Sequence, residues 1–178
     1  VDRLIVLVGR FQKSLISPPA EILHRPLSVH LRDDDIAVPR LRAAFDGAAD
    51  VVALAAETNA DANLEAVRGA GLVILAVKPW MVIDVAREIA EALEPGAIVV
   101  SVAAGVTTAS IEAELPSHVA VVRAMPNTPS LIGRGVTGIA PGASAGEAEV
   151  DTVRRLFETV GSALVVREDQ INAVAAVS

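Results

Sequence analysis

The run LVILAVKP (residues 72–79) is an unbroken aliphatic stretch that stops at a lysine and a proline. A strand that is apolar on both faces is typical of a parallel sheet covered by helices on either side. Its continuation predicts a helix over residues 81–93, because apolar side chains recur there at spacings of three and four. Pro95 and Gly96 then end that helix. The stretch therefore predicts one strand–helix unit of an α/β fold.

The same alternation extends in both directions and predicts a doubly wound, mainly parallel sheet with flanking helices. Ser144 and Glu147 have the spacing of a capping box, which predicts a helix from there to Gly161. Residues 10–39 are rich in proline and fit a crossover helix poorly. The other predicted strands are 4–8, 27–31, 51–55, 97–102, 119–123, 136–140 and 163–166, and the other helices are 40–45, 64–68 and 110–115.

Composition excludes several classes of function. The chain has 178 residues, 52% of them hydrophobic and only 2% aromatic, so its core is built from Val, Ala, Leu and Ile. A net charge of −7 argues against general nucleic-acid binding but leaves room for a nucleotide. No apolar run approaches the roughly 20 residues of a membrane helix, and no signal peptide is recognisable. We expect no nucleic-acid partner, no membrane association and a cytoplasmic location. The chain lacks cysteine, and its three histidines are scattered, so we expect surface histidines and no metal site.

Polar or glycine-bearing breaks follow three successive long strands, at residues 76–79, 101–105 and 123–129. Ligands of doubly wound sheets bind outside the carboxyl ends of the strands, so a parallel sheet would bring all three breaks to one edge. The small residues Ala103, Ala104 and Gly105 would let a planar ring approach the backbone. Asn127 offers both a donor and an acceptor, as a carboxamide or a ribose requires.

Four segments in this order and spacing closely resemble the pyrroline-5-carboxylate reductases. They are AVKP (76–79), VVSVAAGVT (99–107), RAMPNTP (123–129) and GRGVT (133–137). The tail EDQINAVAAVS (168–178) is similar to the segment that leads, in that family, into a Gly-Ser-Gly-Pro substrate loop. The resemblance is strongest over residues 61–178.

The resemblance implies a Rossmann-type domain that binds NADPH or NADH, followed by an all-helical domain that dimerises and completes the substrate site. We expect residues 1–166 to form the dinucleotide-binding domain and residues 167–178 to begin the helical domain, the rest of which the chain lacks. The implied reaction is reduction of 1-pyrroline-5-carboxylate to L-proline, the last step of proline biosynthesis. The implied partners are this small-molecule substrate and further copies of the chain in a homo-oligomer.

By motif position, the resemblance assigns cofactor contacts but no catalytic residue, and it leaves the proton donor unknown. Structural roles stay open for several of these residues: Lys78 as a solvated strand end, Asn63 as a helix cap, Asn127 and Gly105 as turn residues. Trp80 is expected to pack beneath the site. The residues expected to bind the cofactor are Gly9, Asn63, Ala76, Val77, Lys78, Pro79, Ala104, Gly105 and Asn127.

One departure from the family pattern concerns the turn after the first strand. The family has a G-x-G-x-x-G type turn that admits a pyrophosphate to a helix N-terminus, whereas residues 9–14 read GRFQKS and keep only Gly9. Three explanations stay open: the cradle is lost, Arg10 and Lys13 bind phosphate by charge, or shifts of reading frame have altered residues 10–38. Asp33–Asp35 are expected to form a solvated acidic loop, although they would also suit a ribose hydroxyl. Arg32 would equally suit a 2′-phosphate, so the choice between NADH and NADPH is open. The alternatives to an enzyme are a non-catalytic or degenerate dinucleotide-binding module, or an assembly fragment that functions with a partner chain.

Overall fold

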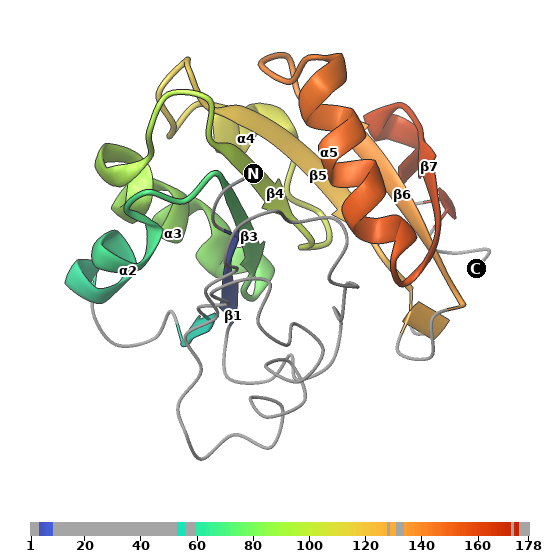
Figure 1. The fold of residues 1–178 in the computed structure, drawn as a ribbon, viewed down its shortest axis with the longest axis horizontal. Coiled ribbons are helices and arrows are strands. Elements are labelled where there is room, and N and C mark those ends of the chain that lie inside the picture. The colour runs from blue at the N-terminus through green and yellow to red at the C-terminus, as the bar shows by residue number, and fades with distance from the viewer. Residues whose placement is uncertain are drawn as a thin grey trace.

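The computed structural model describes residues 4–8, 53–55, 60–127, 129–130, 134–171 and 173–174. These residues form a seven-stranded sheet with the order β2-β1-β3-β4-β5-β6-β7 (Figure 1). The strands are β1 (Leu4–Val8), β2 (Ala53–Ala55), β3 (Leu72–Ala76), β4 (Ile98–Ser101), β5 (Ala120–Met125), β6 (Gly135–Pro141) and β7 (Gly161–Val165).

The first five strands all run in the same direction, and the strand order reverses at β1. The chain passes from β1 to β2 on one side and then to β3 on the other, so β1 pairs in parallel with both. This reversal is the topological switch point at which doubly wound sheets bind their ligands. The sheet changes direction only after β5, because β6 pairs antiparallel with β5 and β7 pairs parallel with β6.

Helices cover both faces of the sheet (Figure 1), and the sheet separates two clusters of buried apolar residues. The helices α2 (Ala60–Val67), α3 (Val82–Ile89) and α4 (Thr108–Glu112) pack on one face, while α5 (Glu147–Glu158) packs on the other. Alternate strand residues point to opposite faces, so Val73 and Leu75 join the α3 side and Leu72 and Ile74 join the α5 side. All four are at most 2% exposed. This double burial explains why β3 is apolar along its whole length.

Most sequence predictions agree with this architecture, and the predicted α/β doubly wound, mainly parallel sheet is confirmed. The strand at 4–8 matches β1, and the helix predicted over 81–93 is α3 extended by two short 3₁₀ turns, η2 (Pro79–Met81) and η3 (Ala90–Ala92). The reversal of direction at β6 was not predicted from the sequence. The strand predicted at 27–31 and the helix predicted at 40–45 lie outside the described residues.

The capping box predicted at Ser144 and Glu147 is wrong. Helix α5 begins two residues later, where the Glu149 carboxylate accepts a hydrogen bond from the backbone N–H of Gly146 at 3.0 Å. The Ser144 hydroxyl is engaged elsewhere, because it donates to Glu112 Oε1 of α4 at 2.6 Å and accepts from the Val121 N–H of β5 at 3.1 Å. A partner distant in the sequence thus displaced the local cap.

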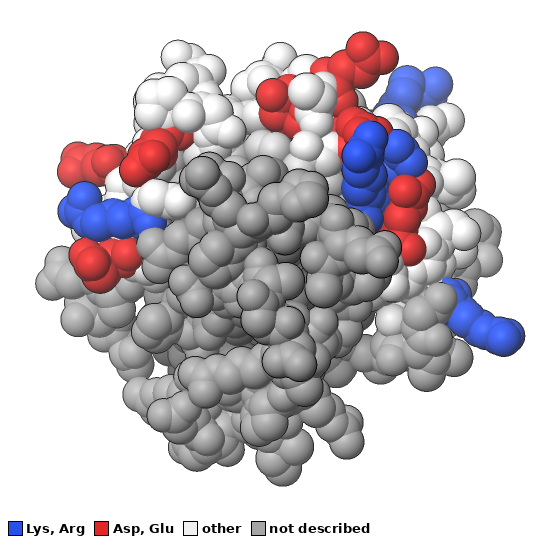
Figure 2. Space-filling model, in the orientation of Figure 1, with Lys and Arg blue, Asp and Glu red and all other residues white. Residues whose placement is uncertain are grey.

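The described surface carries both signs of charge. Figure 2 shows basic and acidic side chains side by side over α5, where Arg154 and Arg155 form ion pairs with Asp151 and Glu158. None of the helices in the described part of the chain has the length and the apolar character that a membrane span requires.

Candidate functional site

The register of the parallel strands brings the three predicted strand-end segments to one edge of the sheet. Leu75 of β3 pairs with Ser101 of β4, and Ser101 pairs with Arg123 of β5. The residues that follow each strand therefore leave the sheet at nearly the same level. The segment after β3 also lies at the switch point, since β3 pairs directly with β1. Lys78, Gly105 and Asn127 thus follow three neighbouring strands at their carboxyl ends.

The first segment is a short extended linker between β3 and the start of α3. Ala76 and Val77 are buried, whereas Lys78 and Pro79 are half-buried. Lys78 has extended backbone angles, and its carbonyl accepts a hydrogen bond from the Met81 N–H at 2.9 Å, which closes the turn η2. The proline starts this turn because its own missing N–H is not needed there.

Trp80 does not pack beneath this segment as predicted from the sequence. Its residue surface is 75% exposed. The turn η2 directs it away from the core, which is already filled by the aliphatic side chains of β3 and α3. The chain's single tryptophan is consequently a solvent-accessible group two residues from Lys78.

The second segment, residues 102–107, connects β4 to α4 through a turn whose backbone is open to solvent. Gly105 has φ +77°, a conformation that strongly favours glycine, and a Cβ there would meet nothing within 4 Å. Both Ala104 and Gly105 are exposed. The Ser101 hydroxyl accepts a hydrogen bond from the Ala103 N–H at 3.3 Å at one end of the segment. At the other end Thr107 caps α4, where its Oγ1 accepts from the Ser110 N–H at 3.2 Å.

Asn127, in the third segment, has a structural contact on one side of its carboxamide. Its Oδ1 accepts a hydrogen bond from the Val136 N–H at 2.9 Å, and its backbone carbonyl accepts from the Ser130 N–H at 3.1 Å. The side chain therefore connects the ends of β5 and β6 two residues beyond their last register pair, Met125 and Gly138. The residue is partly exposed, and this hydrogen bond uses only the oxygen, so the two Nδ2 protons are not consumed by it.

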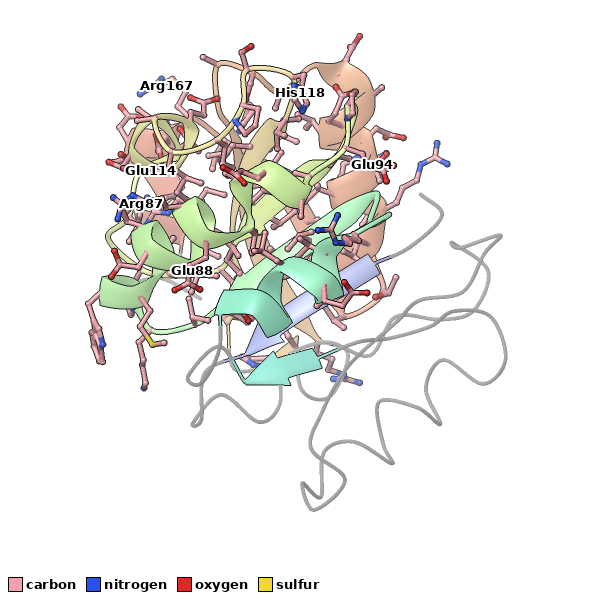
Figure 3. The ribbon with its side chains drawn as sticks, turned by 90° about the vertical axis from the view of Figure 1, so that its left-hand side faces the viewer. Arg87, Glu88, Glu94, Glu114, His118 and Arg167 are labelled. Carbon is pink, nitrogen blue, oxygen red and sulfur yellow. The ribbon has the colours of Figure 1, made fainter. Side chains whose placement is uncertain are left out.

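Asn63 is not a helix cap, because it lies inside α2. It is 1% exposed, and its Nδ2 donates to Glu88 Oε2 of α3 at 2.8 Å. This contact ties α2 to α3, and Figure 3 shows Glu88 on the α3 ribbon. The nucleotide contact predicted for Asn63 stays a prediction. Gly9 lies outside the described residues.

A second polar contact fixes α3 from its other side. Arg87 donates through Nε and Nη2 to the Glu114 carboxylate, at 2.9 and 3.1 Å, just beyond α4; the two residues are labelled next to each other in Figure 3. Glu114 and then Asp84 raise the pKa of Arg87 above its ordinary value. The pair is exposed, so it contributes little to stability, but it connects the helices that follow β3 and β4.

Sequence reasoning missed the contribution of Arg123 and Glu168. The Arg123 side chain is only 3% exposed within β5, and its Nη1 lies 3.8 Å from Glu168 Oε1. Glu168 begins the short turn η5 (Glu168–Gln170) after β7 and also accepts two hydrogen bonds from Thr108. The available signal was a charged residue inside an otherwise apolar strand, since a buried charge needs a partner.

Within the described residues, no group of three or more histidine, cysteine or acidic side chains could hold a metal ion. His118, the one histidine in that part of the chain, is exposed as predicted. The site edge instead offers an open backbone turn, an amide group and a lysine. These groups suit the binding of a ring, a ribose or a phosphate.

Comparison with known proteins finds an oxidoreductase family model and several relatives with one name. A family model described as "NADP oxidoreductase coenzyme F420-dependent" matches residues 42–105. The pyrroline-5-carboxylate reductase of Pseudomonas aeruginosa is 39% identical over 152 residues, which cover 83% of this chain and 56% of that protein. The enzyme of the same name from Mycobacterium tuberculosis is 42% identical over 120 residues, covering 64% of this chain and 41% of that protein.

Over most of its length, the chain is similar in sequence to the pyrroline-5-carboxylate reductases.

Solved structures of this family share the fold. The structure of a pyrroline-5-carboxylate reductase from Coxiella burnetii superposes with a TM-score of 0.71 at 25% identity, covering 98% of this chain and 63% of that one. A Plasmodium falciparum pyrroline carboxylate reductase with NADP bound gives a TM-score of 0.72 at 17% identity, which supports the fold alone. The chain spans about half the length of the curated pyrroline-5-carboxylate reductases that it matches.

Proposed function

We propose that this chain is the dinucleotide-binding part of a pyrroline-5-carboxylate reductase, which reduces 1-pyrroline-5-carboxylate to L-proline with NADPH or NADH. The observation that carries the proposal is the register of β3, β4 and β5, which brings three family-like segments to one sheet edge at the switch point. The curated relatives, 36–42% identical among the bacterial proteins, supply the reaction.

The described residues fit a nicotinamide nucleotide. The Ala104–Gly105 turn exposes its backbone, and the open space at Gly105 would let a flat group approach it. Lys78 brings a positive charge to the end of β3, which suits a phosphate. Asn127 keeps its Nδ2 donor for a carboxamide or a ribose oxygen. We propose these residues, together with Gly9, Asn63, Ala76, Val77 and Pro79, as the nucleotide site.

A bound nicotinamide nucleotide would supply the hydride that reduces the imine carbon of the pyrroline ring. The contribution of this chain is placement: a rigid sheet edge holds the turn, the lysine and the amide in fixed relative positions. Holding two reactants in near contact supplies much of the acceleration of such a reaction. We further propose that residues 1–166 are the nucleotide-binding domain, that residues 167–178 begin a helical domain, and that the active form is a cytoplasmic homo-oligomer.

A non-catalytic dinucleotide-binding module is the second candidate. One observation favours it: residues 9–14 keep a single glycine of the expected phosphate turn. Both candidates bind a nicotinamide nucleotide, and only the first reduces the imine, so one set of measurements separates them.

The single tryptophan makes the first measurement direct. Trp80 is exposed two residues from Lys78, and reduced nicotinamide absorbs where tryptophan emits, so binding of NADPH or NADH should quench Trp80 emission saturably. ATP, which lacks the nicotinamide, is the control for adenine binding alone. The second measurement is loss of NADPH absorbance on addition of 1-pyrroline-5-carboxylate. Quenching with turnover supports the reductase, quenching without turnover supports the module, and no quenching by either cofactor refutes both.

A further inference from the structure

We propose that Glu168 is a positioning residue that fixes the Ala104–Gly105 turn by holding the first residue of α4 against Arg123 of β5. The proposal rests on the nucleotide-binding function proposed above and adds a residue that touches neither cofactor nor substrate. Glu168 comes from the segment after β7, which lies 60 residues beyond Thr108 in the sequence.

The geometry at Glu168 is that of a two-pronged clamp on Thr108. Oε1 accepts a hydrogen bond from the Thr108 backbone N–H at 2.7 Å, and Oε2 accepts from the Thr108 hydroxyl at 2.9 Å. Thr108 is 4% exposed and is the first residue of α4. Hydrogen bonds to an ionised carboxylate are stronger than neutral ones, so this clamp holds both the backbone and the side chain of the helix start.

The same carboxylate lies beside a buried cation. Arg123 Nη1 is 3.8 Å from Glu168 Oε1, and the side chains are 3% and 28% exposed. Arg123 belongs to β5 and pairs in register with Ser101, the last residue of β4. Glu168 therefore links the end of one strand–turn–helix unit to the neighbouring strand of the same sheet.

These contacts hold the C-terminal end of the Ala104–Gly105 turn, at Thr108. The near end is held by Ser101, whose hydroxyl accepts from Ala103, and by the Val102 N–H, which donates to the Leu75 carbonyl at 3.2 Å. The far end, Thr108, is held by Glu168. Ala104 and Gly105 lie exposed between these two anchors.

The turn that carries Glu168 is anchored chiefly by the buried Ile171, and the ion pair beside it is solvent-exposed and contributes little to stability. Arg167 pairs with Asp169 at 3.0 and 3.1 Å, and its backbone N–H donates to the Gln170 side chain. Ile171 is fully buried and packs against Gly138 of β6, so closely that a Cβ added at this glycine would lie 3.3 Å from the Ile171 side chain. Motion of the segment after β7 would therefore be transmitted through Glu168 to the turn between β4 and α4.

The test uses the full chain and four variants. Glu168→Ala removes the clamp, Thr108→Val removes its hydroxyl half, and Thr108→Ser restores that half. Asp169→Asn is the matched control, because it alters an exposed acid of the same turn and leaves Glu168 in place. Hydrogen exchange of the peptide covering residues 102–109 is measured for each, with melting temperature and NADPH affinity.

Faster exchange over 102–109 is expected in Glu168→Ala and Thr108→Val, and parent-like exchange in Thr108→Ser and Asp169→Asn. NADPH affinity is expected to weaken about tenfold in Glu168→Ala, within the range found for residues that act through others, at a temperature where every variant is folded. Unchanged exchange in Glu168→Ala, or faster exchange with parent-like affinity, overturns the proposal. If Glu168→Ala does not fold, the comparison of Thr108→Val with Thr108→Ser tests the proposal in its place. If the parent chain binds no nucleotide, the proposed function is refuted. Hydrogen exchange over residues 102–109 then tests by itself whether Glu168 positions the turn.

Discussion

Replacement of Asn127 by alanine and by aspartate separates its structural role from its proposed role in nucleotide binding. The side-chain oxygen accepts one hydrogen bond from the Val136 N–H at 2.9 Å. Asn127→Ala loses this bond and the Nδ2 donor together. Asn127→Asp keeps an acceptor for the same N–H but has no donor and adds a negative charge.

The two variants should therefore separate the effect of Asn127 on the stability of the fold from its effect on NADPH affinity. One partly exposed hydrogen bond contributes ~0.5–1.5 kcal/mol, which lowers the melting temperature of Asn127→Ala by about 1–6 °C in a chain of this size. Asn127→Asp should melt within about 1 °C of the parent, because its acceptor is retained. Loss of one donor to the cofactor weakens binding roughly 2- to 12-fold in Asn127→Ala. Asn127→Asp should weaken it further, since its charge also repels the phosphates.

Differential scanning fluorimetry and Trp80 quenching by NADPH measure the two quantities on the same samples. An Asn127→Asp variant that binds NADPH as tightly as the parent would refute the donor role and leave Asn127 as a turn residue only. A drop in melting temperature equal to that of Asn127→Ala would instead show that the Val136 contact does not survive the change, and the affinity comparison would lose its internal control.

Three further outcomes follow from the described residues. Gly105→Ala and its matched control Gly96→Ala each place a Cβ in open space at a positive φ, +77° and +84°. Each variant should therefore lose ~1–2 kcal/mol of stability, but only Gly105→Ala should weaken NADPH binding. Equal NADPH affinities of the two variants in calorimetric titration would show that Gly105 is not part of the site. Gly161→Ala should prevent folding or cost more than ~4 kcal/mol, because a Cβ there overlaps the backbone of the β6 strand beside it; a soluble variant with a parent-like circular dichroism melt contradicts this. Arg154 lowers the pKa of Asp151, so this contribution to stability is present above the ordinary aspartate pKa of ~3.9 and is lost as the pH falls through the lower folded-state value. Asp151→Asn should consequently melt below the parent at pH 7 and together with it in strong acid, and a constant difference between the two would count against the ion pair.

The order of strands and helices could be predicted from the sequence because it depends on local periodicity. The run at 72–79 shows both its strand and its end, and α3 shows its buried face in the spacing of Val82, Val85 and Ile89. The expectation that three polar breaks share one edge depended only on the strands being parallel, and the registers of β3, β4 and β5 agree with it.

Several site details could not be predicted because their partners are distant in the sequence. Ser144 has the spacing of a helix cap but bonds to Glu112. Asn63 reads as a cap or a ligand contact but donates to Glu88. Trp80 reads as a core residue but is exposed at a turn. In each case a local signal allows several roles, and the folded neighbours select one.

The sequence by itself determined the fold class and the resemblance to a known family, because hydrophobic periodicity and motif spacing are properties of neighbouring residues. Only the tertiary structure decided the reversal of direction at β6 and the clamp of Glu168 on Thr108. In the clamp, the two hydrogen-bonding partners lie 60 residues apart in the sequence. In the reversal, the hydrogen-bonding partners belong to two neighbouring strands. Such partners are selected only in the folded chain, because a buried polar group without a hydrogen-bonding partner costs free energy.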